Sequence, residues 1–396
     1  MSTQELRVAM VGHAFMGAAH SQAWRTVNRV FDLPARATMV AVCGRDEAKV
    51  TAAASRLGWA EAVTDWRELV KRDDIDVIDV CTPGDSHAEI TIAALEAGKH
   101  VLCEKPLANS VEEAQAMVTA AVTARGHGVR SMCGFSYRRV PAVALLRRLV
   151  ADGRLGVIRH VRAVYLQDWI TDPEFPLVWR LQRDRAGSGA LGDLGAHLVD
   201  LTQFVTGQLI TGVSGSTETF ITSRPLPGEA SGLSAAPASA GVSGVPRGAV
   251  TVDDAAVFTA RLSGGGLATY EATRFATGRR NGLKVEVNGD RGAAVFDVER
   301  LNELEFYDAT RPALEQGFSR ILVTEAEHPY LAAWWPPGHV IGYEHSFTHE
   351  MRDFVEAIAT GTDPSPSFEE ALRVQRVLDA VERSARDDAT WTGVPA

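Results

Sequence analysis

An aspartate and a histidine, Asp193 and His197, stand four positions apart in a segment that continues apolar through Leu201 and Val205. If this segment is helical, both side chains lie on one face, about one turn apart. A carboxylate beside an imidazole suits proton transfer, because the acid can orient the ring and tune its basicity. A plain helix entrance, in which Asp193 offsets the helix dipole, would give the same pattern. The rest of the chain must therefore decide between the two interpretations.

A lysine that could also take part in proton transfer occurs in the sequence Glu104-Lys105-Pro106, directly after a β-favouring apolar run. Proline restricts its own backbone and that of the residue before it, so we expect Lys105 to project from a rigid turn. Beside a positively charged cofactor ring its ammonium would be destabilised, which suits an acid–base group or an anchor for a substrate hydroxyl. A solvated surface lysine is the alternative.

The elements that would position Lys105 alternate between strands and helices. Helices are expected between apolar, β-favouring runs at 6–11, 38–43, 77–81, 100–103 and 129–135. This alternation predicts an α/β fold with a doubly wound parallel sheet, whose ligands bind at the carboxyl ends of the strands. The residues that fall at such ends are Gly12, Gly44, Thr82, Glu104 and Lys105.

A glycine turn, Gly12-His13-Ala14-Phe15-Met16-Gly17, follows the first expected strand. Gly12 would make the tight turn and Gly17 would let the helix pack closely, whereas Ala14 crowds the approach of a pyrophosphate slightly. In the order strand, turn and helix, this motif predicts a dinucleotide site. We expect cofactor contacts from Gly12, Ala14, Phe15, Met16, Gly17, Gly44, Arg45, Thr82, Pro83, His87, Glu104 and Lys105.

The end of the second strand, Cys43-Gly44-Arg45-Asp46, bears on the choice of nicotinamide cofactor. A small residue followed by arginine leaves room for the 2′-phosphate of NADP, whereas an acidic side chain grips the ribose of NAD. Gly44 and Arg45 therefore favour NADP slightly, whereas the nearby Asp46 is compatible with NAD.

The remainder of the chain has a different pattern. A long strand is expected at 156–167, and alternating polar and apolar runs at 255–262, 267–273, 283–287, 293–298 and 303–307 predict antiparallel strands with one wet face. We therefore expect a dinucleotide-binding domain at 1–136 and a second domain, for substrate binding and oligomerisation, at 137–396. The segment 223–249, rich in Pro, Gly, Ala and Ser, is expected to be a surface insertion.

Polar and aromatic side chains follow the long strand at 156–167, as in many sugar sites, although a loop anchored by tryptophans has the same composition. Candidate substrate-binding residues are Lys105, Tyr137, Gln167, Asp168, Trp179, Asp193 and His197.

Bulk properties narrow the class of partner. The net charge of −10 argues against nucleic acid or an anionic membrane surface as the main partner. No signal-like segment or membrane-spanning run is apparent, and the four cysteines stand far apart. We therefore expect a cytoplasmic protein with reduced thiols and no metal site.

Taken together, these motifs resemble the Gfo/Idh/MocA oxidoreductases. The resemblance rests on the glycine turn, Thr82-Pro83, His87, 97–101, Glu104-Lys105-Pro106 and 192–200, in the family's order. It implies a Rossmann domain followed by an α/β domain with a large, mostly antiparallel open sheet, and association into a homodimer or homotetramer. It also implies that Lys105, Asp193 and His197 are catalytic. Two residues depart from the family's pattern. Ala14 stands in the glycine turn, and Gly84 stands after Thr82-Pro83, where many members carry asparagine.

Within the family, the segments 165–169, 186–193, 271–274 and 278–279 are similar to the levoglucosan dehydrogenase branch, and inositol dehydrogenases are related. The resemblance implies hydride transfer from a secondary alcohol of a sugar, anhydrosugar or cyclitol, such as C3 of a pyranose, to NAD or NADP. Two alternatives remain open: an NAD-dependent glycosidase that oxidises C3 transiently, and a non-catalytic dinucleotide-binding sensor.

Overall fold

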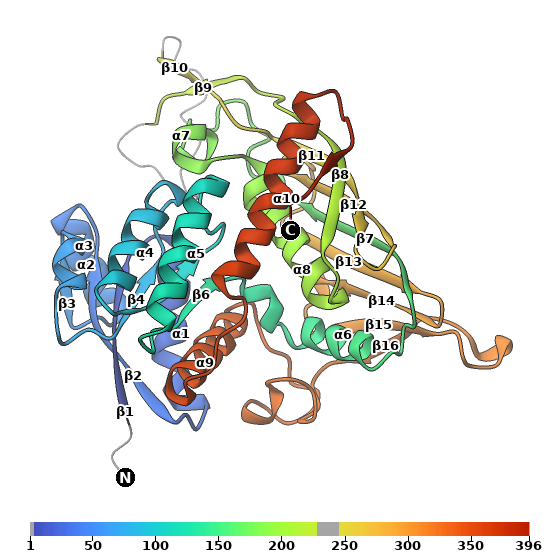
Figure 1. Ribbon diagram of the computed structural model, residues 1–396, viewed down its shortest axis with the longest axis horizontal. Helices are drawn as coiled ribbons and strands as arrows, with labels where there is room; N and C mark the ends of the chain where they lie inside the picture. The colour runs from blue at the N-terminus through green and yellow to red at the C-terminus, as the bar shows by residue number, and fades with distance from the viewer. Residues whose placement is uncertain (1–3, 228–244, 396) are drawn as a thin grey trace. The chain divides into compact units, whose positions relative to one another are not determined.

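The computed structural model of the protein describes residues 4–227 and 245–395. It divides into two compact units, which are described separately (Figure 1). Unit 1 comprises Met1–Arg139 and Gly342–Leu372, and unit 2 comprises Val140–Ile341 and Arg373–Ala396. The segment Gly342–Leu372, placed in the second domain by the sequence analysis, thus packs with the first. Its helix α9 (Glu344–Thr360) buries apolar side chains against α1 (Phe15–Val30) and the neighbouring strands.

Unit 1 is built on a six-stranded sheet of order β3-β2-β1-β4-β5-β6, in which every pair of neighbours is parallel. Its strands are β1 (Gln4–Val11), β2 (Ala35–Cys43), β3 (Glu61–Val63), β4 (Val77–Val80), β5 (His100–Glu104) and β6 (Ser131–Gly134). The connecting helices are α1, α2 (Glu47–Leu57), α3 (Trp66–Val70), α4 (His87–Glu96) and α5 (Val111–Arg125). The predicted parallel Rossmann sheet is confirmed.

Most helices that follow these strands begin at a capping side chain. Asp46 accepts the N–H of Lys49 at the start of α2, and Ser110 does the same for Glu113 in α5. Helix α1 differs, because its N-cap is Ala14 and no side chain accepts its first N–H groups. The amino end of α1 is therefore left with unsatisfied donors.

Unit 2 contains a nine-stranded sheet of order β16-β15-β14-β13-β7-β12-β11-β8-β17, in which only the pairing of β7 with β12 is parallel. Its strands are β7 (Ile158–Leu166), β8 (Ile210–Glu218), β11 (Ala255–Leu262), β12 (Leu267–Thr273), β13 (Gly282–Gly289), β14 (Gly292–Asp297), β15 (Glu303–Asp308), β16 (Ser319–Leu322) and β17 (Thr392–Gly393). The predicted large, mostly antiparallel sheet is confirmed.

Helices α6 (Pro141–Ala151) and α8 (Ala196–Thr206) pack together against one face of this sheet, on β7, β13, β14 and β15 (Figure 1). The short helix α7 (Arg183–Ala186) precedes α8, and α10 (Phe368–Arg386) lies mostly in unit 2. The opposite face of the sheet is mixed in character. It exposes Val257 and Leu267, but also an ion pair between Arg162 and Glu286.

The ends of the expected insertion at 223–249 form a small antiparallel pair, β9 (Ser223–Pro225) with β10 (Arg247–Ala249). Residues 228–244 of this insertion lie outside the described residues. The side chain of Arg224 is buried and donates to the carbonyls of Ile170 and Asp172, which ties β9 to the loop after β7. Among the described residues, no helix is long and apolar enough to cross a membrane.

Unit 1 also buries a carboxyl group whose ionisation opposes folding. Glu350 of α9 is fully buried, with Oε1 3.7 Å from Nη1 of Arg139. Burial raises the pKa of Glu350 to about 8, although Arg139 acts in the opposite direction. The unfolded chain ionises near the ordinary value of 4.5, so the contribution of Glu350 to the free energy of unfolding should fall as pH rises from 4.5 to about 8.

We therefore predict that Glu350→Gln flattens the pH dependence of stability in this window. Denaturant titrations of both proteins at pH 6 and pH 8.5 measure the effect. The free energy of unfolding of the wild type should decline relative to that of the variant as pH rises. Parallel pH profiles would contradict the prediction.

Candidate active site

The turn between β1 and α1 brings the backbone close to its neighbours and requires glycine at two positions. Gly12 has a φ of +101°, and a Cβ added there would lie 2.6 Å from the carbonyl oxygen of Cys81. A Cβ on Gly17 would lie 2.2 Å from the carbonyl oxygen of Gly12. Ala14, by contrast, has a φ of −74°, which an alanine adopts without strain.

This turn fits the pyrophosphate of a dinucleotide. Helix α1 has neither a capping side chain nor an acidic residue in its first turn, so its free N–H groups and dipole favour an anion there. Ala14 and Phe15 at this end are exposed, and Met16 is partly buried. The close backbone approach at Gly12 and Gly17 and the uncapped amino end of α1 are thus the two features that fit the cofactor.

The end of β2 holds the residues expected at the adenosine ribose. A Cβ on Gly44 would lie 2.4 Å from the ring of His13, so this position also leaves no room for a side chain. Arg45 is exposed at the surface. Asp46 is engaged as the N-cap of α2, and the backbone N–H of Lys49 lowers the pKa of its carboxyl.

A buried histidine braces two of the loops at the carboxyl edge of the sheet. His87 lies 2.9 Å through Nε2 from the carbonyl of Thr82 and 2.9 Å through Nδ1 from that of Pro106. Burial opposes the charged ring, but Cys103 and the two carbonyls outweigh burial and raise the pKa of His87 to about 9. His87, expected to contact the cofactor, thus uses both ring nitrogens to join the loop of Thr82 and Pro83 to the turn after β5.

That turn presents Lys105, which is partly buried at the end of β5. Oε2 of the buried Glu104 accepts the backbone N–H of Lys105 at 3.0 Å. Asn109 explains the departure at Gly84, because a Cβ there would lie 2.4 Å from Asn109 Oδ1. Tyr137 is buried, and its ring packs edge-on against another tyrosine of unit 1.

In unit 2, Asp193 lies in a π-helical turn, Leu191–Gly195, which leads directly into α8. The segment is thus helical, but the turn that carries Asp193 is wider than the regular α-helix on which the one-turn spacing of Asp193 and His197 was based. Asp253, which lies more than 60 residues further along the chain, holds this turn, because its carboxylate accepts the backbone N–H groups of Gly189 and Leu191 at 2.6 and 2.7 Å. Such π-turns inside helices are frequent at functional sites.

Asp193 is anchored by an arginine from the end of β12. Nη2 of Arg274 donates to Oδ2 of Asp193 at 2.9 Å and to the carbonyl of Gly189 at 3.1 Å. The guanidinium is buried and stacks 5.4 Å from the ring of Trp169, while 29% of the Asp193 side chain is exposed. Arg274 thus fixes one carboxylate oxygen of Asp193 at a partly open position.

His197 is buried in α8 beside the ring of Tyr165, at 5.8 Å between centroids. The hydroxyl of Tyr165 donates to Oδ1 of Asn281, which also accepts from Nε2 of Gln167. Oε1 of Gln167 in turn accepts the indole N–H of Trp169. The structure therefore joins His197 and Gln167, two predicted site residues, through Tyr165 and Asn281.

The other two candidates, Asp168 just after β7 and Trp179 further along the same connection, have different surroundings. Both carboxylate oxygens of Asp168 are engaged, one with the guanidinium of Arg280 and one with the backbone N–H of Gly278, each at 3.0 Å. Asp168 thus holds the loop after β12. Trp179 is partly buried and stacks with Arg180 at 4.3 Å.

The sequence analysis assigned no role to Arg274, Asp253, Tyr165 or Asn281. Arg274 and Tyr165 fell within the segments that resemble the levoglucosan dehydrogenase branch, so a signal for them was present. Asp253 and Asn281 act through contacts with residues more than 60 positions away, and no local pattern marks them.

The contact between Gly189 and Asp253 yields a stability prediction. A Cβ at Gly189 would lie 1.7 Å from the carbonyl oxygen of Asp253, so Gly189→Ala must displace the turn that carries Asp193. We expect a loss of about 1–3 kcal/mol in the free energy of unfolding, measured by denaturant titration. Gly317→Ala is the control, because its Cβ would meet nothing within 4 Å. Equal stabilities of the two variants would contradict the prediction.

Comparison with known proteins identifies the family. One family model, described as an oxidoreductase family with an NAD-binding Rossmann fold, matches residues 6–134, and the GFO/IDH/MocA C-terminal domain matches residues 143–295. A levoglucosan dehydrogenase from Pseudarthrobacter phenanthrenivorans is 40% identical over 394 residues, which cover 99% of each chain. The chain belongs to the GFO/IDH/MocA oxidoreductase family.

Two solved structures are similar to this chain over its whole length. An oxidoreductase domain protein from Kribbella flavida is 59% identical, with a TM-score of 0.93, and covers 99% of this chain and 100% of its own. A levoglucosan dehydrogenase in complex with NADH and levoglucosan is 38% identical, with a TM-score of 0.91 and the same coverage. The family resemblance inferred from the motifs is thus confirmed.

Proposed function

We propose that this oxidoreductase is an NAD-dependent dehydrogenase that oxidises a secondary alcohol of a sugar, anhydrosugar or cyclitol, such as C3 of a pyranose. The anchored pair of Asp193 and His197 is the observation that carries the proposal. It occurs in a chain similar over its full length to a levoglucosan dehydrogenase bound to NADH and levoglucosan.

Nicotinamide, when bound, would accept the hydride, with its two electrons, from the carbinol carbon. His197, helped by Lys105, takes the hydroxyl proton as that carbon becomes a carbonyl. Asp193, held by Arg274, orients the substrate or the imidazole. General-base assistance of this kind contributes about 10²–10⁴-fold to a rate.

We assign the substrate hydroxyls to a set of polar groups with aromatic neighbours, a combination common in carbohydrate sites. Gln167 supports this assignment best, because it is only partly buried and is oriented by Asn281 and Trp169. The further candidates are Lys105, Tyr137, Asp168, Trp179, Asp193 and His197. Asp168 contributes through the loop that it holds.

We propose NAD as the cofactor, in place of the lean toward NADP. The relatives' NADH complexes and the NAD-binding description of the family model support this choice. Parallel titrations of NADH and NADPH, followed by quenching of intrinsic fluorescence, test it: NADH should bind more tightly. Tighter binding of NADPH would restore the interpretation based on Arg45.

The proposal includes assembly into a homodimer or homotetramer in the cytoplasm. The exposed Val257 and Leu267 on the open face of the large sheet support association there. The four cysteines are free and buried, as suits a reducing compartment.

A spectrophotometric screen tests the function. NAD⁺ and NADP⁺ are combined with levoglucosan, inositols, glucose, xylose and simple glucosides, and absorbance is followed at the NADH band. Net NADH formation from at least one non-glycosidic sugar or cyclitol is expected. Cleavage of a glucoside without net NADH would favour a glycosidase, and cofactor binding without any turnover would favour a sensor.

A further inference from the structure

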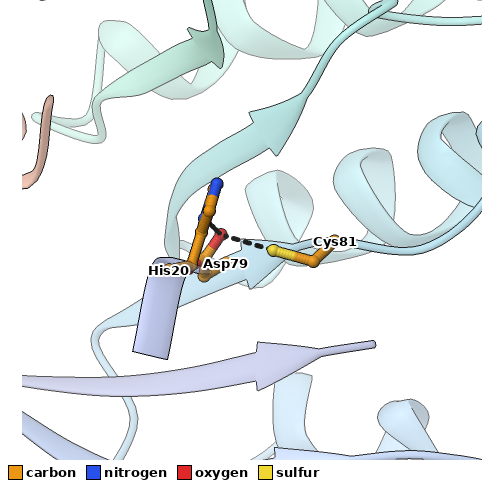
Figure 2. Close-up of side chains that lie close together, drawn as sticks. All are labelled: His20, Asp79 and Cys81. Carbon is orange, nitrogen blue, oxygen red and sulfur yellow. Dashed lines mark hydrogen bonds and ion pairs between the residues drawn. The ribbon is translucent and has the colours of Figure 1, made fainter. Parts of the chain in front are cut away.

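A chain of hydrogen bonds crosses the core of unit 1 behind the turn that carries Lys105. His20 of α1 lies between two carboxylates (Figure 2 shows its contact with Asp79). Its Nδ1 is 3.0 Å from both oxygens of Asp79 on β4, and its Nε2 is 3.1 Å from Oε1 of Glu104 on β5. The other oxygen of Glu104 accepts the backbone N–H of Lys105. Asp79 of β4, His20 of α1, Glu104 of β5 and Lys105 in the turn after β5 thus form one continuous path.

Asp79, at the end of the path away from Lys105, is also held by its neighbours. Asp79 accepts the indole N–H of Trp24 at 2.8 Å, and the thiol of Cys81 lies 3.5 Å from Oδ1 of Asp79 (Figure 2). A Cβ on Gly134 of β6 would lie 3.0 Å from Oε1 of Glu104, so this glycine leaves the space that the carboxylate occupies. The carboxylates therefore have little freedom to move.

Two ionised carboxylates on opposite sides of the ring favour a charged imidazole. A neutral imidazole has one N–H, so it would turn a lone pair toward one of the two carboxylates, whereas imidazolium donates to both. Burial opposes the charge, but the Asp79 carboxylate outweighs burial and raises the pKa of His20 well above its usual value. The ring of Phe347 in α9 lies 5.6 Å away, and the titratable groups that face His20 from this part of the chain are Glu350 of α9 and Tyr343, which precedes α9.

A metal site is the competing explanation, because ligand atoms of His20, Asp79 and Cys81 lie within 4.8 Å of one another. The contacts between them are, however, at hydrogen-bond distances. The direct hydrogen bonds account for all three side chains.

We propose that His20 and Asp79 are positioning residues for Lys105 and act on it through Glu104. His20 fixes the Glu104 carboxylate, and that carboxylate fixes the peptide from which the Lys105 side chain projects. The inference has two sides. Its structural side, that His20 fixes the Lys105 peptide through Glu104, does not depend on the proposed dehydrogenase function. Its catalytic side, that this fixed position supports turnover, rests on that proposed function.

Hydrogen exchange tests the structural side in the full-length protein without cofactor. The peptide containing Lys105 is compared by mass spectrometry in the wild type, His20→Gln, Glu104→Gln and His100→Gln. His100 is the matched control, because it lies at the other end of β5 and burial lowers its pKa to about 4, so its loss removes no charge.

We expect exchange at Lys105 to accelerate about tenfold in His20→Gln and Glu104→Gln, as loss of a charge-assisted hydrogen bond implies, and to stay unchanged in His100→Gln. Asp79→Asn, which keeps the imidazole, should show a smaller acceleration and serves if His20→Gln does not fold. Wild-type exchange in both His20→Gln and Asp79→Asn would overturn the proposal. So would one equivalent of zinc in the purified protein.

A double-mutant cycle on kcat tests the catalytic side. His20→Gln should lower kcat by about 10- to 100-fold, because a displacement of about 1 Å can cost 10²-fold. The KM for the sugar and the Kd for NADH should not change. Because His20 acts through Glu104, His20→Gln/Glu104→Gln should be no slower than Glu104→Gln alone.

Losses in kcat that multiply would mean that His20 has only a general structural role, and they would overturn the proposal. A wild type that forms no NADH from any sugar would refute the proposed function instead, and hydrogen exchange would still decide whether His20 positions Lys105.

Discussion

Replacing His197 by asparagine should lower kcat for sugar oxidation by about 10²- to 10⁴-fold, the contribution typical of a positioned general base. Asparagine keeps a polar side chain of similar reach in α8 but cannot take a proton from the substrate. The Kd for NADH should stay unchanged, because the features that fit the dinucleotide belong to unit 1. Steady-state kinetics and a fluorescence titration of NADH measure the two quantities.

His127→Asn is the matched control, because His127 is exposed in the turn after α5 and has no proposed role. Its kcat should equal that of the wild type. A His197→Asn protein with wild-type kcat would remove His197 from the mechanism. Loss of NADH binding with loss of turnover would instead assign the variant's defect to folding.

Arg274→Met should lower both stability and turnover. Methionine retains much of the packing volume but leaves Asp193 and the carbonyl of Gly189 without their donor. Breaking a buried ion pair from one side costs about 3–5 kcal/mol in the free energy of unfolding. Because Asp193 then loses its anchor, kcat should also fall, by about 10²-fold if the carboxylate shifts by about 1 Å.

Arg279→Met provides the comparison five residues further along. Arg279 is 56% exposed and pairs with Glu299 at 2.9 Å, so its loss should change the free energy of unfolding by less than about 1 kcal/mol. Denaturant titration and kinetics are run on both variants. If Arg274→Met keeps the stability and kcat of Arg279→Met, then Arg274 does not anchor a functional carboxylate.

The Rossmann part of the fold was predictable because its signals are local. The apolar runs of β1, β4 and β5 are long or strongly β-favouring, and the glycine turn marks the start of α1. The sequence analysis missed β3 and α3, which are only three and five residues long and too short for a periodic pattern. It also assigned α9 to the wrong neighbours, since an amphipathic helix does not reveal what it packs against.

The candidate site also has a part that local motifs predict and a part that depends on distant contacts. Lys105, Asp193 and His197 could be proposed from motifs, but the surroundings that shape them come from distant parts of the chain. The π-helical turn of Asp193 depends on Asp253, and the fixed position of its carboxylate depends on Arg274, 81 residues away. Such long-range bonds between polar groups leave no periodic trace in a single sequence.

The central claim is that a hydride moves from a sugar carbon to nicotinamide. The most direct test uses the sugar identified by the screen, deuterated at the oxidised carbon, with NAD⁺ and the wild-type protein. The proposal predicts that the deuterium is recovered in the NADH, as detected by mass spectrometry. Deuterium that stays on the sugar or is released to water, while NAD⁺ is bound, would contradict it.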